Sequence, residues 1–299
     1  MPPSAEETNL TAPSVVAAIL KRHGLRPNKS LGQSFLIDRN VLDRIVAAAE
    51  LAADDTVLEV GAGMGTLTRE IAKAARRVLA VELDRGLLAV LAETVGTLQN
   101  VTVVPGDVLK LDLVALLRQE GVSTAKVIAN LPYYITTPAL AAFIQLARAA
   151  KPMLVALIVV LVQKEVAARL AAAPGTDEYG ALSVMAQYHA QVELVATVSR
   201  NVFLPAPKVD SSIVRLRVRD HPPVDVADER LFFDVVKAAF GQRRKTLANA
   251  LAGASGLRLG RAEAGALLSR VEIDPSRRGE TLSIAEFAVV ANALAGART

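Results

Sequence analysis

The sequence predicts a doubly wound α/β domain with a smaller helical domain behind it. Segments patterned as strands alternate with segments patterned as helices from residue 56 to residue 172. The strand segments are rich in β-branched residues and almost continuously apolar, which is typical of parallel strands buried on both faces. Beyond residue 230 only helical patterns remain. We therefore expect one sheet between two layers of helices, followed by a helical domain.

The elements are expected in a regular order. A short helix over residues 13–23 carries Pro13 in its first turn, where the missing N–H costs little, and a second helix follows over residues 39–50. Strands are then expected at 56–60, 77–83, 101–107, 125–130 and 153–162, and helices at 66–75, 86–95, 112–120, 137–150 and 164–172. Two further strands, at 192–199 and 211–219, complete the sheet.

Residues 220–229 (DHPPVDVADE) combine two prolines with several acids and little apolar content, which is typical of a linker. The predicted organisation is an N-terminal helix and loop (1–38), the α/β domain (39–219), the linker (220–229) and a domain of about four short helices (230–299).

The composition argues against several classes of protein. The chain has no cysteine and only 3 histidines, His23, His189 and His221, at unrelated spacings, so we expect no disulfide and no metal site. The N-terminus is acidic and lacks the apolar core of a signal peptide. The most apolar run, residues 153–162, is too short to cross a bilayer. We expect a cytoplasmic, monomeric protein without a membrane partner.

Net charge is only +4, but the basic residues are concentrated. Residues 21–39 and residues 199–219 each hold five Lys or Arg against one acid, and residues 235–262 hold six and no acid. The remainder of the chain is therefore acidic. Three basic segments on such a chain favour a nucleic-acid partner if they fold onto one side.

A glycine loop, VLEVGAGMGTLT, joins the first strand of the predicted sheet to a helix and holds Gly61, Gly63 and Gly65. Glycines there allow a ligand to approach the backbone at a helix N-terminus. A dinucleotide site has the spacing G-x-G-x-x-G, whereas Thr66 stands at the last of those positions here. The spacing therefore favours a ligand without a pyrophosphate.

Two acids are expected beside that loop. Glu82 ends the second strand and Asp107 ends the third, and the carboxyl ends of parallel strands are where such sheets bind ligands. Glu82 is suited to accept both hydroxyls of a ribose, and Asp107 to accept from the exocyclic amine of an adenine. Either acid alone is as readily a solvated residue at a strand end. Together with the glycine loop they predict a pocket for S-adenosylmethionine.

The fourth strand runs directly into Asn130-Leu131-Pro132-Tyr133, which places this stretch at the same edge of the sheet. An adenine amine is a poor nucleophile that needs two acceptors for its hydrogens, and the Asn130 amide oxygen and the Leu131 carbonyl are suited to that task. Pro132 would fix the backbone, and Tyr133 would offer a face on which the base stacks. We expect these four residues to be catalytic, with the target base flipped out or unpaired.

The combination of GQSFLID, EVGAGMGTLT, AVELD, NLPYYITTP, LVQKEVAARL, YGALSVMAQY, FLPAPKVDSSIVRL and FGQRRKTLANAL closely resembles the KsgA (RsmA) family of small-subunit ribosomal RNA adenine dimethyltransferases. The resemblance extends from about residue 20 to the C-terminus. It implies a Rossmann-like class I methyltransferase sheet with a C-terminal helical RNA-binding domain. It also implies the transfer of four methyl groups to two adjacent adenosines in the terminal hairpin loop of the small-subunit RNA, within a precursor of the 30S particle.

Site residues follow from the same resemblance. Those that would contact the cofactor are Ser34, Leu36, Gly61, Gly63, Glu82, Asp107 and Asn130. Those that would contact the substrate are Tyr133, Phe203, Lys208, Arg243, Arg244 and Lys245. The loop within residues 1–38 would cover the cofactor.

Two positions depart from the family pattern. Ser34 stands where asparagine is frequent, and NLPYYIT replaces NLPYNIS, so that Tyr134 has no role assigned from the sequence. The segment after Gly241 is expected to begin a helix exposed to phosphate, although Arg243 and Arg244 would serve equally well in salt bridges between domains.

Three other functions compete. One is methylation of a single adenine in the large-subunit RNA, as in macrolide-resistance enzymes, against which FGQRRKTL and PAPKVDS argue. Another is DNA adenine methylation, which would call for a separate target-recognition region. The third is a ribosome-assembly factor for which methylation is secondary, and the sequence does not separate it from catalysis.

Overall fold

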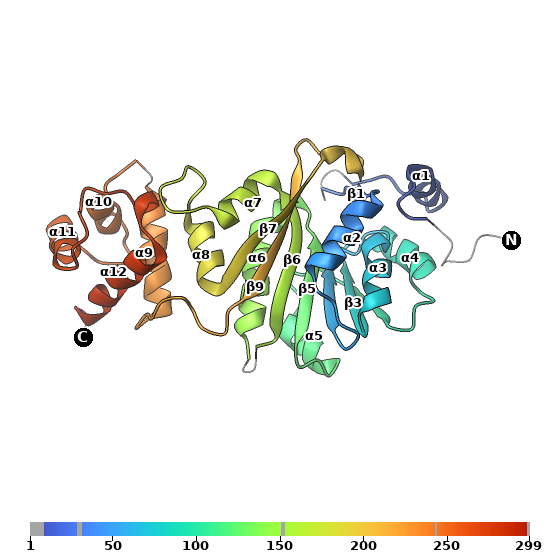
Figure 1. Ribbon diagram of the computed structural model, residues 1–299, viewed down its shortest axis with the longest axis horizontal. Coiled ribbons are helices and arrows are strands. Elements are labelled where there is room, and N and C mark those ends of the chain that lie inside the picture. Colours follow the sequence, from blue (N-terminus) through green and yellow to red (C-terminus); the bar gives the residue numbers. More distant parts are fainter. Residues whose placement is uncertain (1–8, 29–31, 151–152, 243, 298–299) are drawn as a thin grey trace. The chain divides into compact units, whose positions relative to one another are not determined.

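The computed structural model describes residues 9–28, 32–150, 153–242 and 244–297 (Figure 1). The chain forms two compact units, which we call the sheet unit (residues 1–167 and 192–218) and the helical unit (residues 168–191 and 219–299). The α/β domain predicted from the sequence covered residues 39–219 without interruption.

The sheet unit is built on a seven-stranded sheet with the strand order β4-β3-β2-β5-β6-β9-β7. The strands are β2 (Thr56–Val60), β3 (Arg77–Glu82), β4 (Val101–Pro105), β5 (Ala125–Asn130), β6 (Val155–Gln163), β7 (Ala190–Val198) and β9 (Ser211–Val218). β4, β3, β2, β5 and β6 run parallel, and β9 pairs with β6 antiparallel. The predicted α/β fold class is therefore confirmed, and the strand order reverses between β2 and β5.

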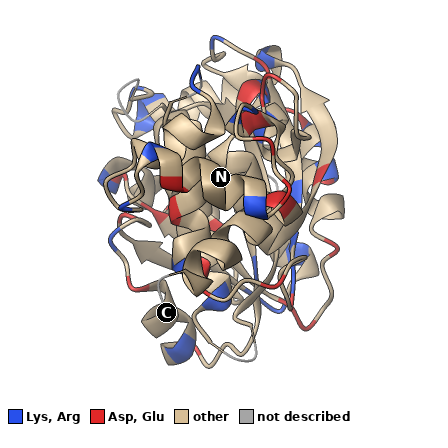
Figure 2. Ribbon diagram, turned by 90° about the vertical axis from the view of Figure 1, so that its left-hand side faces the viewer, with Lys and Arg blue, Asp and Glu red and all other residues tan. Residues whose placement is uncertain are grey.

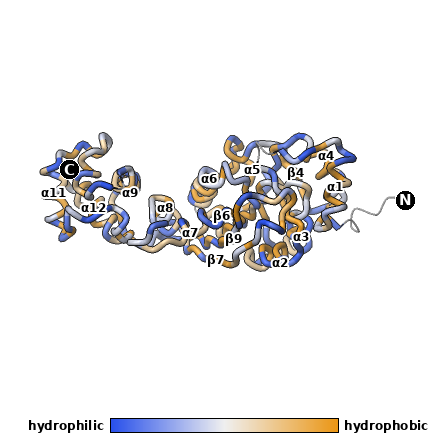
Figure 3. The backbone as a smooth tube through the Cα atoms, turned by 90° about the horizontal axis from the view of Figure 1, so that it is seen from above, coloured by the Kyte–Doolittle hydropathy of each residue, from blue (hydrophilic) through white to orange (hydrophobic). Residues whose placement is uncertain are grey.

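Helices cover this sheet because its strands carry apolar side chains on both faces. α2 (Arg39–Ala48), α3 (Thr66–Ala74) and α4 (Arg85–Thr94) bury residues in one core cluster with Val57, Val78 and Ile128. The alternate residues of the same strands, such as Leu58, Leu79 and Val127, are fully buried as well. The sheet unit also contains α5 (Leu113–Gln119) and α6 (Thr136–Arg148), and α7 (Lys164–Ala171) crosses the boundary between the two units. In Figure 3 the hydrophobic and hydrophilic colours alternate along the helices, as expected for helices with one buried side.

The N-terminal segment forms a further layer of the sheet unit. α1 (Pro13–Arg22) buries Val16, Ile19 and Leu20 in a cluster with Met64 and Val90. Two very short strands follow from tertiary pairing alone, β1 (Phe35–Leu36) and β8 (Phe203–Leu204), which run antiparallel with Leu36 opposite Phe203. The sequence did not predict this pair, because two-residue strands leave no periodic pattern.

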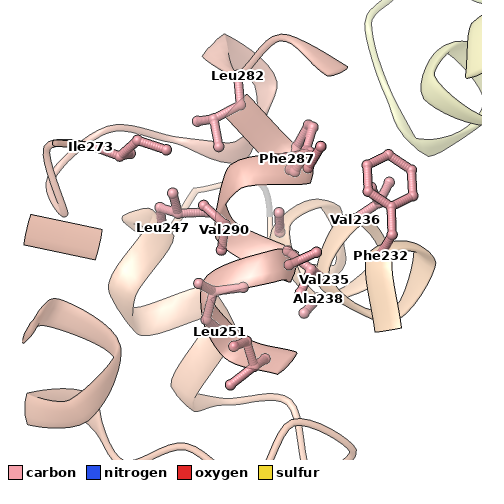
Figure 4. Close-up of a cluster of buried hydrophobic side chains, with 14 of the residues drawn as sticks. Phe232, Val235, Val236, Ala238, Leu247, Leu251, Ile273, Leu282, Phe287 and Val290 are labelled. Carbon is pink, nitrogen blue, oxygen red and sulfur yellow. The ribbon is translucent and has the colours of Figure 1, made fainter. Parts of the chain in front are cut away.

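The helical unit has its own apolar core. α9 (Glu229–Gly241), α10 (Leu247–Ala252), α11 (Arg261–Arg270) and α12 (Ile284–Gly296) surround side chains that include Phe232, Val236, Leu251 and Phe287 (Figure 4). This confirms the predicted C-terminal helices. α8 (Ala181–His189) joins the same core through Val184 and Tyr188, and the Tyr188 and Phe232 rings stack at 4.8 Å between centroids.

The structure differs from two local predictions in the helical unit. Gln242 caps the C-terminal end of α9, and Arg244 and Lys245 lie in the turn before α10, so the segment after Gly241 does not begin a helix. Within the predicted linker, Asp228 is the N-cap of α9 and accepts from the Leu231 N–H at 3.0 Å. The Asn292 side chain binds the backbone of Asp225 and Ala227, so this end of the segment is held against α12.

In the part of the chain that the structure describes, no helix combines the length and the apolar character needed to cross a membrane.

Candidate active site

A cleft of the sheet unit opens at the carboxyl ends of the parallel strands. Its empty space, with the solvent at its mouth included, is about 1160 Å³. Its walls come from residues 32–36, 60–64, 81–83, 106–108 and 130–135 and from Phe203. This is the place where a sheet of this kind binds ligands, because the strand order reverses between β2 and β5.

Gly61 and Asn130 lie side by side where the strand order reverses, at the ends of β2 and β5. Gly61 follows β2 with φ +78°, and a Cβ atom built on it would lie 3.3 Å from the Asn130 carbonyl oxygen. A side chain at position 61 would therefore be strained and would crowd the end of β5. The predicted glycine and the predicted catalytic asparagine are thus direct neighbours.

The N–H groups of the glycine loop are largely used within the protein. Gly61 and Ala62 donate to the Val81 carbonyl at 2.9 and 3.2 Å, and the Gly65 N–H donates to the Ala62 carbonyl at 2.9 Å. The Thr94 hydroxyl supports the loop from behind by donating to the Met64 carbonyl at 2.9 Å. A pyrophosphate would call for these N–H groups, so the loop fits a ligand without one.

Glu82 ends β3 with its carboxylate turned onto the glycine loop. Its Oε2 accepts from the Gly63 N–H and its Oε1 accepts from the Asp84 N–H, both at 2.8 Å. The side chain is buried, and this burial raises the pKa of Glu82 despite those backbone hydrogen bonds. Each carboxylate oxygen keeps a second lone pair, so Glu82 retains the capacity to accept from ribose hydroxyls.

β4 ends at Pro105, so Asp107 lies just beyond the strand rather than at its last position as predicted, and it also lines the cleft. Its Oδ1 accepts from the Leu109 N–H at 3.0 Å, and Lys110 Nζ lies 3.6 Å from its Oδ2. The carboxylate is therefore oriented by its own turn.

The segment from Asn130 to Tyr133 is held at both ends. The Leu131 N–H donates to the Leu161 carbonyl at 3.3 Å, and the Pro132 carbonyl accepts from the Ile135 N–H at 3.1 Å. Leu131 is buried, whereas Asn130 is only half-buried and lines the cleft. Toward the described residues, the Asn130 side-chain amide makes no hydrogen bond, and this leaves it available to a ligand in the cleft.

The two tyrosines of this segment differ. Tyr133 is half-buried, and its phenol oxygen lies 3.0 Å from the Ser211 hydroxyl oxygen. Burial raises the pKa of Tyr133, so its ring is a neutral phenol near pH 7. Tyr134 also lines the cleft but is 54% exposed. Phe203 lines the cleft as well but is only 4% exposed.

The N-terminal loop contributes one wall through contacts that the sequence did not indicate. The Ser34 hydroxyl donates to the Pro205 carbonyl at 2.9 Å, which ties this loop to the segment after Phe203. The Gln33 side chain donates to Asp84 at 2.7 Å and so joins the loop to the start of α4. Gln33 belongs to the GQSFLID motif, which was the only signal that could have singled it out. Leu36 is buried beside the cleft.

The basic residues proposed for RNA binding have different surroundings. Lys208, Arg244 and Lys245 are exposed, and Arg243 lies outside the described residues. Arg215 and Arg217 of β9, in the second of the basic segments, form ion pairs with Glu50. In the view of Figure 2, basic residues are interspersed with acidic ones rather than gathered in one block.

Among the residues that the structure describes, no group of three or more His, Cys, Asp or Glu side chains is placed to hold a metal ion.

Comparison with known proteins agrees with this geometry. A family described as "Ribosomal RNA adenine dimethylase" matches residues 24–295. The "Ribosomal RNA small subunit methyltransferase A" of Pelotomaculum thermopropionicum is 49% identical over 290 residues, which are 95% of this chain and 96% of that protein. The protein of the same name from Clostridioides difficile is 45% identical over 284 residues, 95% and 96% of the two chains.

Two solved structures have a similar fold. A dimethyladenosine transferase from Plasmodium falciparum matches with a TM-score of 0.70 and 24% identity, covering 86% of this chain and 95% of that one. The 23S rRNA methyltransferase ErmE matches with a TM-score of 0.63 and 29% identity, covering 87% and 99%. The family match spans most of the sequence and includes every residue of the cleft described above, so the chain belongs to the ribosomal RNA adenine dimethylase family.

Proposed function

We propose that this protein transfers methyl groups from S-adenosylmethionine to the N6 amines of two adjacent adenosines in the 3′-terminal hairpin loop of small-subunit (16S) ribosomal RNA. The products are N6,N6-dimethyladenosines. The observation that carries the proposal is Asn130, whose side-chain amide lies half-buried in the cleft without a hydrogen bond to any described residue. A polar group so placed is suited to a substrate that brings its own donors.

The cleft fits the proposed cofactor. A nucleoside with an amino-acid tail needs hydroxyl and amine acceptors more than phosphate donors, and the glycine loop has already used the N–H groups of Gly61, Ala62 and Gly63. Glu82 would hold the ribose hydroxyls and Asp107 the adenine amine. The bound cofactor supplies an electrophilic methyl group on a sulfonium.

The protein's own part is to bind and orient the amine. Asn130 Oδ1 and the Leu131 carbonyl would each accept one N6 hydrogen, which draws the nitrogen toward a tetrahedral geometry. Tyr133 and Phe203 would receive the adenine between them, with base stacking worth about 1–3 kcal/mol. The amine would lose its proton to solvent only after the N–C bond has formed and with S-adenosylhomocysteine as the other product, so no base is needed beforehand and positioning supplies most of the rate enhancement.

The small-subunit RNA is favoured over the large-subunit RNA by the comparisons. The relatives at 45% and 49% identity carry the small-subunit name, whereas the 23S enzyme is 29% identical. We infer that the chain acts as a monomer in the cytoplasm, on RNA within a precursor of the small subunit. We also infer that residues 1–38 cover the cofactor and that residues 230–299, which include Arg243, Arg244 and Lys245, bind RNA together with Lys208.

The test is mass mapping of methylated adenosines after the protein and S-adenosylmethionine are incubated with unmethylated small subunits and, separately, with large-subunit RNA. Four methyl groups on two adjacent adenosines near the 3′ end of the small-subunit RNA are expected. Methylation of a single large-subunit adenine would instead support the macrolide-resistance function. Tight binding to precursor subunits without any methyl transfer would support an assembly factor.

A further inference from the structure

Ser211 lies at the same edge of the sheet as the catalytic segment. It is the first residue of β9 and pairs with Gln163, the last residue of β6. On the other side of β6, Asn130 pairs with Leu161. Since β6 lies between β5 and β9, Ser211 stands two strands away from Asn130 at the same end of the sheet.

The Ser211 hydroxyl reaches Tyr133 across that distance. The two hydroxyl oxygens are 3.0 Å apart, and Ser211 is only 1% exposed, so water has little access to compete for the bond. Tyr133 is fixed at its backbone end by the Asn130–Tyr133 segment and at its phenol end by Ser211. A side chain fixed at both ends has lost its freedom to swing about χ1.

The support for Ser211 is itself rigid. The carbonyl of the preceding residue, Asp210, accepts from the Lys164 N–H at 3.0 Å. The Asp210 carboxylate accepts from the Arg200 N–H at 3.0 Å, just before the segment that carries Phe203. Ser211 is therefore tied both to the end of β6 and to the segment that leads to the second aromatic residue of the cleft.

We propose that Ser211 is a positioning residue for methyl transfer, whose hydroxyl holds the Tyr133 ring in the position at which the target adenine stacks. This role rests on the proposed function. Without the bond the ring can swing about χ1, and an adenine stacked on it shifts its N6 away from Asn130 and Leu131. Displacement of a reacting atom by about 1 Å can cost 10²-fold in rate, so a modest rotation is sufficient to matter.

The first experiment compares Ser211→Ala with Ser212→Ala. Ser212 is the next residue of β9, is 5% exposed and, because side chains alternate along a strand, points to the opposite face. The single-turnover rate of methyl transfer should fall about fivefold to tenfold in Ser211→Ala, as expected for one lost hydrogen bond, and change less than about twofold in Ser212→Ala. The cofactor Kd measured by calorimetry should stay the same in both variants.

The second experiment removes the other half of the bond. Tyr133→Phe keeps the ring and loses the hydroxyl, so adding Ser211→Ala to it should cause no further fall in rate. If Ser211→Ala lowers the rate by the same factor in both backgrounds, Ser211 acts through packing and the proposal is overturned. Ser211→Thr, which keeps a hydroxyl, should restore the rate to within about twofold of the unaltered protein.

The outcomes separate this role from the proposed function. An unaltered protein that transfers no methyl group to small-subunit RNA contradicts the function. Equal rates for the unaltered protein and Ser211→Ala, in a preparation that does methylate that RNA, contradict the positioning role alone.

Discussion

Polar side chains have different partners at the two ends of the parallel strands. At the amino ends of the parallel strands, charged groups are paired with each other: Glu50 binds Arg215 at 2.6 Å and Arg217 at 2.9 Å, and Lys126 binds Asp55 at 2.7 Å. At the carboxyl ends, Glu82 is held by two backbone N–H groups, and no basic side chain among the described residues forms an ion pair with it.

This difference shows where the protein keeps binding capacity. An ion pair satisfies both partners and leaves little for a ligand, whereas a carboxylate oriented by the backbone keeps free lone pairs. Asn130 goes further, since its side chain has no hydrogen bond to the described residues at all. The charged groups named at the amino ends are therefore bound to each other, whereas Glu82 and Asn130 at the carboxyl ends keep capacity for a ligand, although Asp107 there lies near Lys110. The predictions that follow test this contrast, from the largest expected effect to the smallest.

Asn130→Ala should lower the rate of methyl transfer by about 10²- to 10³-fold, the loss typical of one positioned hydrogen-bonding group at a reacting centre. Binding to precursor subunits should be retained, because the residues proposed to bind RNA, Lys208, Arg244 and Lys245, are unchanged. Transfer of labelled methyl groups to undermethylated subunits is the measurement. A rate of transfer equal to that of the unaltered protein would show that Asn130 is not the acceptor.

Gly61→Ala should destabilise the protein by about 1–2 kcal/mol, because its φ of +78° disfavours a side chain, and should also weaken cofactor binding. Gly121→Ala is the matched control: its φ is +66°, but nothing lies within 4 Å of the position of a Cβ atom. Thermal unfolding should show a loss for both variants and a larger one for Gly61→Ala, whose Cβ atom would crowd the Asn130 carbonyl. Calorimetry should show weaker cofactor binding only for Gly61→Ala, and an equal effect in both would argue against the crowding of Asn130.

Glu59→Gln should stabilise the protein more at pH 8 than at pH 5. Burial raises the pKa of Glu59 to about 8, and its Oε2 has no hydrogen-bond partner among the described residues. The folded state therefore holds a proton that the unfolded state releases near the ordinary glutamate pKa of 4.5, so stability falls as pH rises from about 4.5 to about 8. The glutamine cannot ionise. A difference in unfolding free energy that does not change with pH would show that Glu59 is charged in the folded protein.

Arg244→Ala together with Lys245→Ala should reduce the slope of log Kd for RNA against log salt by about 1.4–1.8, since each phosphate contact contributes about 0.7–0.9. Arg215→Ala with Arg217→Ala removes the same amount of charge from the ion pairs with Glu50 and should leave the slope unchanged. A smaller slope in this second variant would mean that the paired arginines bind RNA after all.

Glu50→Gln should cost less than about 1 kcal/mol and leave the methylation rate unchanged, because exposed ion pairs contribute little. Hydrogen bonding to Arg217 lowers the pKa of Glu50, so its contribution is present near pH 7 and is lost as the pH falls through the acid range. Denaturant unfolding at pH 7 and pH 3 would reveal this dependence. A stability difference from the unaltered protein that is the same at both pH values would contradict it.

The elements with a clear period were the ones that the sequence predicted well. The strands at 56–60 and 125–130 have the predicted bounds, because buried parallel strands are marked by continuous apolar residues between turns. α8 was missed since most of its residues, among them Leu182, Val184 and Tyr188, are buried, and a helix covered on several sides shows no apolar stripe.

The sequence by itself determined the succession of the main strands and helices along the chain, the glycine loop and the polar residues at the strand ends. Local patterns mark these elements, and because parallel strands share one direction, the loop and the polar residues come together at the carboxyl ends of the strands. The tertiary structure alone decided which polar groups form hydrogen bonds or ion pairs with each other. Glu50 is joined to Arg217 and Tyr133 to Ser211 by contacts between residues 167 and 78 positions apart. No local pattern carries such a pairing, since it depends on how strands lie side by side after folding.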